Sequence, residues 1–316
     1  PRAAYVHLAQ GIKEVVDIPV ITVGRINDPR LAEQILEDGK ADLVAMGRAL
    51  FADPELPNKA RRGEFDDIAP CIACNRCEMA TSRNVRVRCT VNPSLGNERS
   101  YPMDPVKESK RLLVVGGGPA GMTAATLAAR RGHSVTLYEM EEQLGGQLIL
   151  AGTPPLKEEV TGYAEYLEKQ VRKAGVNIVL GEKATPELIE RLQPEAVIVA
   201  AGARQIIPRI PGVDGSTVVN AWEVLKGEAE ATGRILVVGG GMVGLETAEY
   251  LVEMGKKVEI VEMLPEVGMD MEPFSKVFLL ERLQEENVRI HTSHRVNEIK
   301  AGVVEATREN GEKELI

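Results

Sequence analysis

The pattern of apolar and polar positions at the start of this 316-residue chain predicts alternating helices and buried strands. Residues 3–16 carry apolar side chains at helical spacing, which favours an amphipathic helix. Two later runs, residues 19–24 and 41–48, are almost continuously apolar, as strands of a parallel sheet covered on both faces require. A helix is expected between them, over residues 30–38. This order of helices and strands indicates α/β organisation.

Both apolar runs end in the dipeptide Gly-Arg, as Gly24-Arg25 and Gly47-Arg48. Glycine lets a phosphate approach backbone N–H groups, and arginine offers a bidentate positive charge. A surface arginine after a strand is commonplace on its own. Its repetition at equivalent positions of consecutive units is typical of the phosphate site formed by the last two strands of a TIM barrel.

A glycine-rich loop follows a short β-rich strand predicted over residues 111–115. Its glycines Gly116, Gly118 and Gly121 have the spacing G-x-G-x-x-G, and an apolar helix follows. In such loops the first glycine makes the turn, the second lets pyrophosphate touch the backbone, and the third packs the helix on the strand. A second strand ends in Glu139, 23 residues after Gly116, where a carboxylate can accept from ribose hydroxyls. The alternative is a tight turn that binds no nucleotide.

The same pattern recurs further along the chain, with Gly239, Gly241 and Gly244 in the loop and Glu262 as the acid. Residues 114–139 and 237–262 align without a gap, which indicates an internal repeat of a nucleotide-binding βαβ unit. Glu262 would repel a 2′-phosphate and accept from a 2′-hydroxyl, so the pattern favours NADH over NADPH.

All four cysteines fall within 19 residues, at Cys71, Cys74, Cys77 and Cys89, with the spacing C-x2-C-x2-C-x11-C. Four thiolates this close along the chain suit one iron–sulfur cluster. Zinc remains an alternative, although zinc sites usually show two separated C-x2-C pairs. A disulfide framework is typical of small secreted domains, and unrelated buried cysteines would be scattered.

Composition restricts the classes of partner. The net charge of −9 and the pI of about 5.3 argue against nucleic acid and against anionic membranes. No apolar run reaches the roughly 18 residues of a membrane helix. No signal pattern is present, so we expect a cytoplasmic protein. The chain lacks an initiator methionine and opens within a helical pattern, and we expect a piece of a longer polypeptide.

Together these motifs resemble the multidomain branch of the old-yellow-enzyme family, the NADH:flavin oxidoreductases that include 2,4-dienoyl-CoA reductase, 2-enoate reductase and trimethylamine dehydrogenase. The resemblance implies a 4Fe-4S cluster on the four cysteines and an FMN phosphate site, which would lie at Gly24, Arg25, Gly47 and Arg48. Dienoyl-CoA reductases have one more residue between the second and third cysteine. The spacing here is nearer to that of the amine dehydrogenases.

The resemblance also separates the two glycine loops. In such flavoproteins a Gly-Gly pair like Gly145-Gly146 follows the acid and lines the flavin pyrophosphate, so the first loop is expected to bind FAD and the second NADH or NADPH. The implied FAD residues are Gly116, Gly118, Pro119, Ala120, Gly121, Glu139, Gly146, Gln147, Ala184, Ala201 and Gly202. The implied NAD residues are Gly239, Gly241, Met242, Val243, Gly244, Glu246 and Glu262.

The expected domains are the end of a TIM barrel (1–66), an iron–sulfur segment and linker (67–110), an FAD-binding domain (111–232) and an incomplete NAD(P)H-binding domain (233–316). The first functional hypothesis is electron transfer from NADH through FAD and the cluster to FMN, which would reduce an activated C=C bond of an enoate or enoyl-CoA. The second is an amine or N-methyl dehydrogenase that sends electrons from FMN through the cluster to a carrier protein, with ADP in the first site.

The expected partners are a small-molecule substrate and either a second copy of the chain or a separate barrel fragment. The residues that would donate a proton to the substrate belong to earlier barrel strands that this sequence does not contain. No catalytic residue is therefore assigned.

Overall fold

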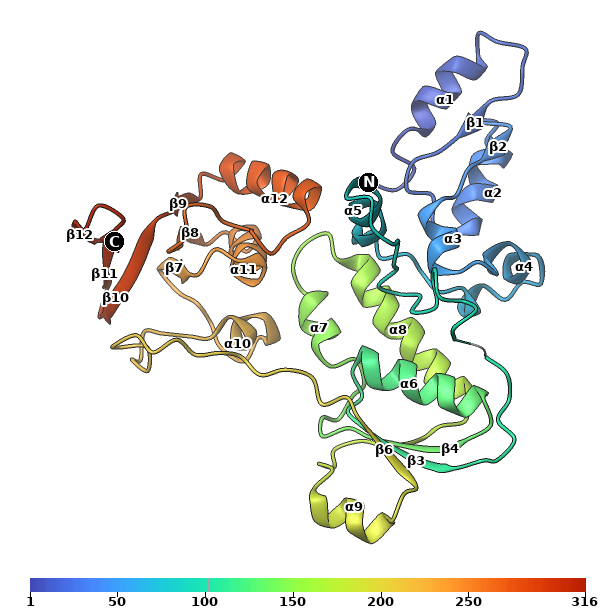
Figure 1. Cartoon of the computed structure of the whole chain (residues 1–316). Helices are drawn as coiled ribbons and strands as arrows, with labels where there is room; N and C mark the ends of the chain where they lie inside the picture. Colours follow the sequence, from blue (N-terminus) through green and yellow to red (C-terminus); the bar gives the residue numbers. More distant parts are fainter. Residues whose placement is uncertain (102) are drawn as a thin grey trace. The chain divides into compact units, whose positions relative to one another are not determined.

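A computed structural model describes residues 1–101 and 103–316 of the chain, and it confirms the α/β class (Figure 1). The chain forms two compact units. Unit 1 comprises Pro1–Leu148 and Glu159–Gly202, and unit 2 comprises Ile149–Glu158 and Ala203–Ile316. The barrel-like segment, the cysteine segment and the first glycine loop therefore belong to one unit. The four-domain division expected from the sequence stays a prediction.

Unit 1 begins with a two-stranded parallel sheet in which Ile21 pairs with Leu43. Its elements are α1 (Val6–Lys13), β1 (Ile21–Thr22), α2 (Pro29–Glu37), β2 (Leu43–Val44), α3 (Arg48–Ala52), α4 (Leu56–Arg61), a 3-10 turn (Phe65–Asp67) and α5 (Arg76–Ser82). Helix α2 starts where expected, because the Asp28 side chain accepts from the N–H of Arg30 at 2.9 Å.

The expectation that both of these strands are buried on both faces is wrong. Ile21 is 61% exposed and Leu43 is 50% exposed, whereas the neighbouring Thr22 is only 1% exposed. One face of the pair packs on the helices, and the other carries the positions that would point into a barrel. Two strands cannot close a barrel, so these apolar side chains stay half or more exposed.

The second part of unit 1 is a four-stranded parallel sheet in the order β5-β4-β3-β6. Its elements are β3 (Arg111–Val115), α6 (Pro119–Arg130), β4 (Ser134–Tyr138), α8 (Glu158–Lys173), β5 (Asn177–Val179), α9 (Pro186–Leu192) and β6 (Ala196–Val199). Helix α7 (Gln147–Ala151) begins in unit 1 and continues into unit 2 at Ile149. Helices α6 and α8 cover one face of the sheet and α9 covers the other (Figure 1). This is the doubly wound arrangement that binds dinucleotides at the carboxyl ends of the strands.

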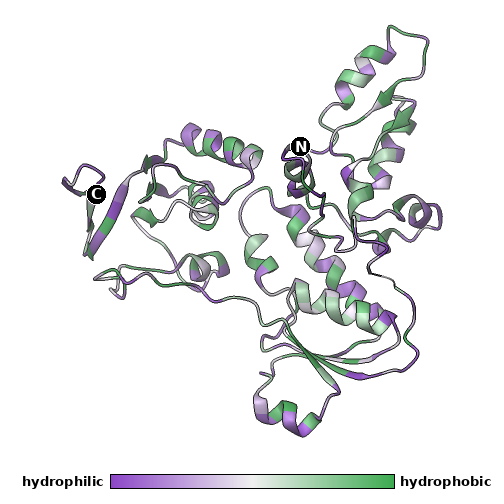
Figure 2. Ribbon diagram, in the orientation of Figure 1, coloured by the Kyte–Doolittle hydropathy of each residue, from purple (hydrophilic) through white to green (hydrophobic). Residues whose placement is uncertain are grey.

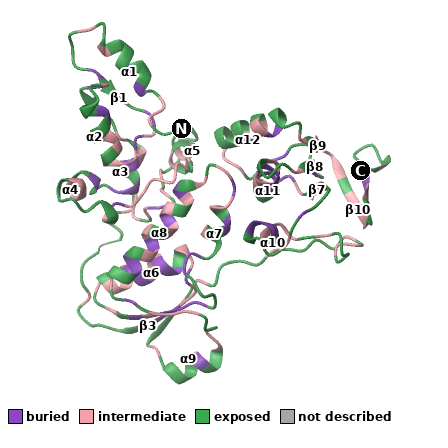
Figure 3. Cartoon of the chain, turned by 180° about the vertical axis from the view of Figure 1, so that it is seen from behind, coloured by how far each residue is buried: buried purple, intermediate pink, exposed green. Residues whose placement is uncertain are grey.

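Alternation along β3 explains how both faces of the sheet are covered. Val114 joins the core under α6 and α8, whereas its neighbour Leu113 packs with Leu188 of α9. Hydrophobic colour accordingly runs along β3, β4 and β6 in Figure 2. Figure 3 shows buried residues on α6 and α8, while α9 is largely exposed.

Unit 2 contains a second parallel sheet in the order β7-β8-β9 and an antiparallel sheet in the order β10-β11-β12. Its elements are α10 (Ala221–Lys226), β7 (Arg234–Val238), α11 (Met242–Glu253), β8 (Lys257–Val261), α12 (Pro273–Glu285), β9 (Arg289–His291), β10 (His294–Lys300), β11 (Val303–Arg308) and β12 (Lys313–Leu315). In the antiparallel sheet, hydrogen bonds from Arg308 and His294 lower the pKa of the Glu314 carboxyl to about 2.

Candidate functional site

The first glycine loop makes backbone contacts that leave no room for a side chain at its first and last glycines. Gly116 has a φ of +108°, and a Cβ there would lie 2.3 Å from the carbonyl oxygen of Ala200. A Cβ on Gly121 would lie 1.8 Å from the carbonyl oxygen of Gly116. The turn at Gly116 and the tight start of α6 at Gly121 thus require glycine, as the spacing predicted. A Cβ on Gly118 would meet only the Cα of Gly146, at 4.0 Å, and the predicted role of Gly118 stays a prediction.

A second loop reaches the N-terminus of α6. Gly146 has a φ of +53°, and a Cβ there would lie 3.0 Å from the Cα of Gly118. Gln147 approaches Gly202, since a Cβ on Gly202 would lie 3.5 Å from Gln147 Nε2. The structure therefore gathers Gly116–Gly118, Gly146–Gln147 and Ala201–Gly202 at one edge of the sheet. Because these glycines carry no Cβ, the backbone here leaves space in which a dinucleotide pyrophosphate can approach the N–H groups.

Glu139 lies at the end of β4 and is 8% exposed. Its carboxylate accepts from the N–H of Gly117 at 2.5 Å and from the N–H of Glu141 at 3.0 Å. These bonds hold the acid against the glycine loop, where further lone pairs remain for ribose hydroxyls. Ala184 packs instead in the core beneath α9, with Leu188. The binding roles of these residues stay predictions.

The second glycine loop, in unit 2, repeats this geometry. Gly239 has a φ of +107°, and a Cβ on Gly244 would lie 1.9 Å from the carbonyl oxygen of Gly239. Glu262 is 9% exposed and accepts from the N–H of Gly240 at 2.7 Å. It also accepts from the N–H of Leu264 at 2.8 Å. Each acid therefore contacts the middle glycine of its own loop in the same way.

At the second loop, Gly241 is the N-cap residue of α11, and as a glycine it provides no side chain to cap the helix. Met242 and Val243 are 42% and 47% exposed at the first turn of the helix. Glu246 forms an ion pair with Lys157, which lies in the short stretch of unit 2 that precedes α8. The sequence did not indicate this lysine, because 89 residues separate it from Glu246.

Sequence reasoning also missed Asp270. Its carboxylate accepts from the N–H of Met242, at 2.9 Å to Oδ1 and 3.2 Å to Oδ2. The repeat in fact continues beyond the acids, because Gly145 and Gly268 each donate an N–H to the middle glycine's carbonyl, at 3.0 and 2.7 Å. Extending the alignment by eight residues would have placed Asp270 opposite Gln147.

The cysteine segment curls through two left-handed residues, Ala73 with a φ of +52° and Asn75 with a φ of +54°. All four cysteines are free thiols. The Cys74 Sγ lies 3.3 Å from Thr90 Oγ1, which brings the segment of the fourth cysteine beside the second. Burial raises the pKa values of the Cys71 and Cys77 thiols.

Cys71 and Cys89 pack against the core that α6 and α8 share. Tyr163 of α8 belongs to that core, and its hydroxyl forms a hydrogen bond with Thr123 of α6. The donor set of four thiols in one segment fits an iron–sulfur cluster. Across residues 1–101 and 103–316, no three His, Cys, Asp or Glu side chains are grouped around a metal position. The cluster and the zinc alternative therefore both stay predictions.

At the barrel end, the two arginines expected to hold the FMN phosphate contact other partners. Arg25 pairs with the carboxylate of Glu159 at 2.7 Å, and Arg2 reaches the same oxygen at 3.2 Å. Glu159 is 6% exposed at the start of α8. The Arg25 Nε is buried without a hydrogen-bond partner, and an unsatisfied donor of this kind is compatible with a phosphate ligand. Gly24, with a φ of +128°, lies against Tyr5.

Arg48 follows Gly47 at the start of α3 and donates to the side-chain oxygen of Asn75, inside the cysteine segment. Asn27 donates to the carbonyl oxygen of Cys71 at 3.1 Å. The loops after β1 and β2 therefore both contact the cysteine segment. No sequence motif indicated these contacts, although Arg48 and Cys71 are themselves predicted site residues.

Comparison with protein-family models identifies the chain. Residues 110–316 match the pyridine nucleotide-disulphide oxidoreductase model. The chain belongs to this family. Residues 2–67 match the model of the NADH:flavin oxidoreductase / NADH oxidase family. The two matches occur in the order expected from the motifs, which confirms the resemblance to multidomain old-yellow enzymes.

Individual relatives show the same combination. An NADH oxidase of Thermoanaerobacter brockii is 44% identical over 98% of this chain and 49% of its own length. A solved structure of 2-naphthoyl-CoA reductase with 2-naphthoyl-CoA has a TM-score of 0.95 at 32% identity, covering all of this chain and 48% of that one. The structure of histamine dehydrogenase from Rhizobium sp. 4-9 has a TM-score of 0.88 at 27% identity, and the match covers 100% of this chain and 49% of that one. The chain thus spans about half the length of these relatives.

Within the described part of the chain, none of the helices combines the length and the apolar character needed to cross a membrane.

Proposed function

We propose that the chain carries the electron-transfer part of an NADH-dependent flavin oxidoreductase. In this proposal electrons pass from NADH through FAD and a 4Fe-4S cluster to FMN, for reduction of an activated C=C bond in an enoate or enoyl-CoA. The observation that carries it is the pair of matching glycine loops, each with a buried acid bonded to its middle glycine. Two dinucleotide sites in one chain are what a pyridine nucleotide and a flavin require.

The chain's own residues have separable tasks in this proposal. The loop at Gly116 would hold FAD, with Glu139 on the ribose, and the loop at Gly239 would hold NADH, with Glu262 on the ribose. Cys71, Cys74, Cys77 and Cys89 would ligate the cluster. Bound flavin supplies the conversion between hydride transfer and single-electron transfer.

FMN would be held at its phosphate by Arg25 and Arg48, together with Gly24 and Gly47. The unpartnered Nε of Arg25 supports this assignment. The rest of the FMN site, the proton donor and the substrate pocket would be supplied by barrel strands absent from this sequence. The barrel, a small-molecule substrate and either a second copy of the chain or a separate barrel fragment are the partners we propose.

A second function is favoured by one specific feature. The C-x2-C-x2-C spacing is nearer to that of the amine dehydrogenases, and histamine dehydrogenase is among the matching structures. In that case electrons would leave FMN through the cluster to a carrier protein, with ADP in the first site. The Gly145-Gly146-Gln147 loop and Glu262 favour the NADH-driven reductase instead.

The content of the purified protein separates the two proposals. After anaerobic denaturation, the released nucleotide is identified by chromatography, and iron and labile sulfide are assayed. FAD with about four irons and four sulfides per chain is expected, as for one cubane cluster. ADP without FAD would support the amine-dehydrogenase proposal. Zinc in place of iron would refute the electron-transfer role in both.

A further inference from the structure

We propose that Asp270 sets the affinity of the second dinucleotide site, because its carboxylate occupies the position at the N-terminus of α11 that the pyrophosphate of NADH must take. This inference rests on the proposed role of residues 239–262 as the NADH site. It adds a competing group within the protein that the nucleotide has to displace.

The contacts place Asp270 at the anion position of the helix. Both of its oxygens lie within hydrogen-bond distance of the Met242 N–H, at 2.9 and 3.2 Å. A Cβ on Gly241 would lie 3.4 Å from Asp270 Oδ2, so the carboxylate stands directly against the glycine that opens the helix. Helix α11 runs over 12 residues, and its N-terminal N–H groups and dipole attract negative charge.

The first glycine loop provides an internal comparison. In both sites an N–H of the following loop donates to the middle glycine, and an apolar side chain, Leu144 or Val267, lies 2.5 Å from where that glycine's Cβ would be. The two loops then diverge at equivalent positions. The first continues as Gly146-Gln147 and the second as Met269-Asp270. A neutral amide thus stands in one site where a carboxylate stands in the other.

This difference matches the tasks of the two nucleotides. FAD would remain bound through many turnovers, and position 147 carries no carboxylate that would compete with its pyrophosphate. NADH has to bind and leave in each turnover, and a competing carboxylate lowers its affinity without altering the fold. Asp270 is exposed, so its side chain can rotate into solvent without burying a charge.

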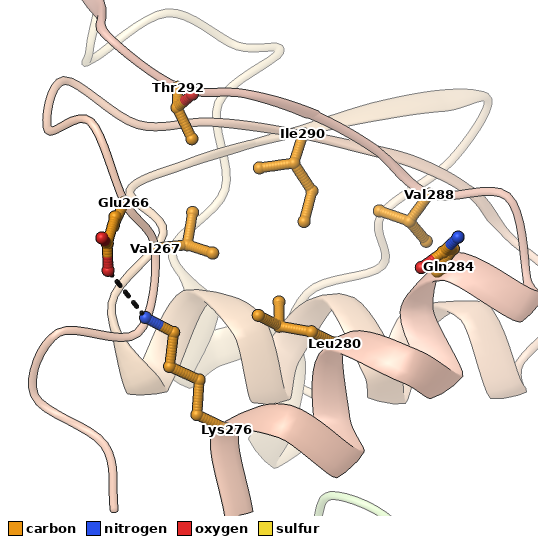
Figure 4. A pocket seen from close by; sticks show the side chains of 8 residues that line it. All are labelled: Glu266, Val267, Lys276, Leu280, Gln284, Val288, Ile290 and Thr292. Carbon is orange, nitrogen blue, oxygen red and sulfur yellow. Dashed lines mark hydrogen bonds and ion pairs between the residues drawn. The ribbon is translucent and has the colours of Figure 1, made fainter. Parts of the chain in front are cut away.

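The loop that carries Asp270 also has space behind it. Val267 and Glu266 of this loop form one side of a groove of about 510 Å³, whose other residues come from α12 and from the strand that follows it (Figure 4). Glu266 pairs with Lys276 across this groove at 3.3 Å. The loop is therefore held by its contacts with Gly240 and by Val267 in the core, and the groove lies along the side that Glu266 and Lys276 share.

The test uses the full chain and measures dissociation constants for NAD⁺ and ADP-ribose by isothermal titration calorimetry. The variants are Asp270→Ala, which removes the carboxylate, and Asp270→Asn, which keeps its shape and removes its charge. We expect about 2- to 5-fold tighter binding for both, from the usual strength of an exposed carboxylate at a helix N-terminus. Glu266→Gln, which removes a charge from the same loop without a contact to α11, is the matched control and should bind as the wild type does.

The outcomes separate this inference from the proposed function. If the wild type binds NAD⁺ and both Asp270 variants bind it with equal or weaker affinity, the proposed role of Asp270 is refuted and the NADH site is not. Absence of binding in the wild type and in every variant overturns the NADH site, and the inference with it.

Discussion

Replacing Gly121 with alanine should destabilise unit 1, because the start of α6 has no room for a methyl group. The added Cβ would lie 1.8 Å from the carbonyl oxygen of Gly116 and 3.0 Å from its carbonyl carbon. Ordinary contact begins near 3.4 Å, so backbone, and not a flexible side chain, would have to move. Overpacking usually costs about 1–3 kcal/mol, and an unyielding backbone neighbour puts this case near about 3 kcal/mol.

Gly162→Ala is the matched control within the same unit. Gly162 lies inside α8, and nothing stands within 4 Å of the Cβ it would gain. Alanine there should stabilise the helix by about 0.5–1 kcal/mol, since glycine is the poorer helix former. The same chemical change is thus expected to have opposite signs at two positions.

The assay is urea unfolding followed by far-ultraviolet circular dichroism, with fluorescence of Trp222 recorded in parallel. Trp222 is the single tryptophan and belongs to unit 2, so its signal reports on the unit that neither substitution touches. Gly121→Ala should lower the urea midpoint of the unit 1 transition, which circular dichroism detects and Trp222 fluorescence does not. Gly162→Ala should raise that midpoint. Equal stabilities of the two variants would refute the steric reasoning.

Three further predictions concern charges and a helix cap. Glu159→Gln should lower the free energy of unfolding by about 2 kcal/mol, because Arg25 loses its buried partner. The double variant with Arg25→Met should recover part of this loss. Purely additive effects of the two substitutions would contradict the pairing. Asn220→Ala should cost about 1 kcal/mol in unit 2 by removing the capping box of α10, as measured by tryptophan fluorescence; an unchanged midpoint would exclude that cap. The lowered pKa of Glu314 implies stability that is present above pH 4.5 and is lost as the pH falls through about 2. Glu314→Gln should therefore flatten the pH dependence of unit 2 unfolding in that range, and a profile that matches the wild type would argue against it.

The two glycine loops could be predicted because their requirements are local. Gly116, Gly121 and Glu139 meet within one strand-helix-strand unit, and a continuous stretch of the sequence contains all of that unit. The second loop repeats those demands, so Gly244 and Glu262 follow by the same reasoning. The parallel pairing of β3 with β4 and of β7 with β8 follows from the same βαβ pattern.

Other features could not be predicted because they depend on residues distant in the chain. Arg25 was expected to face a phosphate, yet its partner Glu159 comes from a helix in the middle of the sequence. The exposure of Ile21 and Leu43 depends on what packs on the second face of their two-stranded sheet, which the apolar runs do not specify. Asp270 is a different case, since carrying the repeat alignment past Glu262 would have found it.

The central claim, that one chain passes electrons from a pyridine nucleotide to a flavin and on to a cluster, is tested most directly by anaerobic reduction of the purified holoprotein with NADH. Flavin absorbance and the electron paramagnetic resonance signal of the cluster are followed together. We predict that NADH bleaches the flavin and that the signal of a reduced cluster then appears. Flavin that stays oxidised with excess NADH, or a reduced flavin with no cluster signal, would contradict the account.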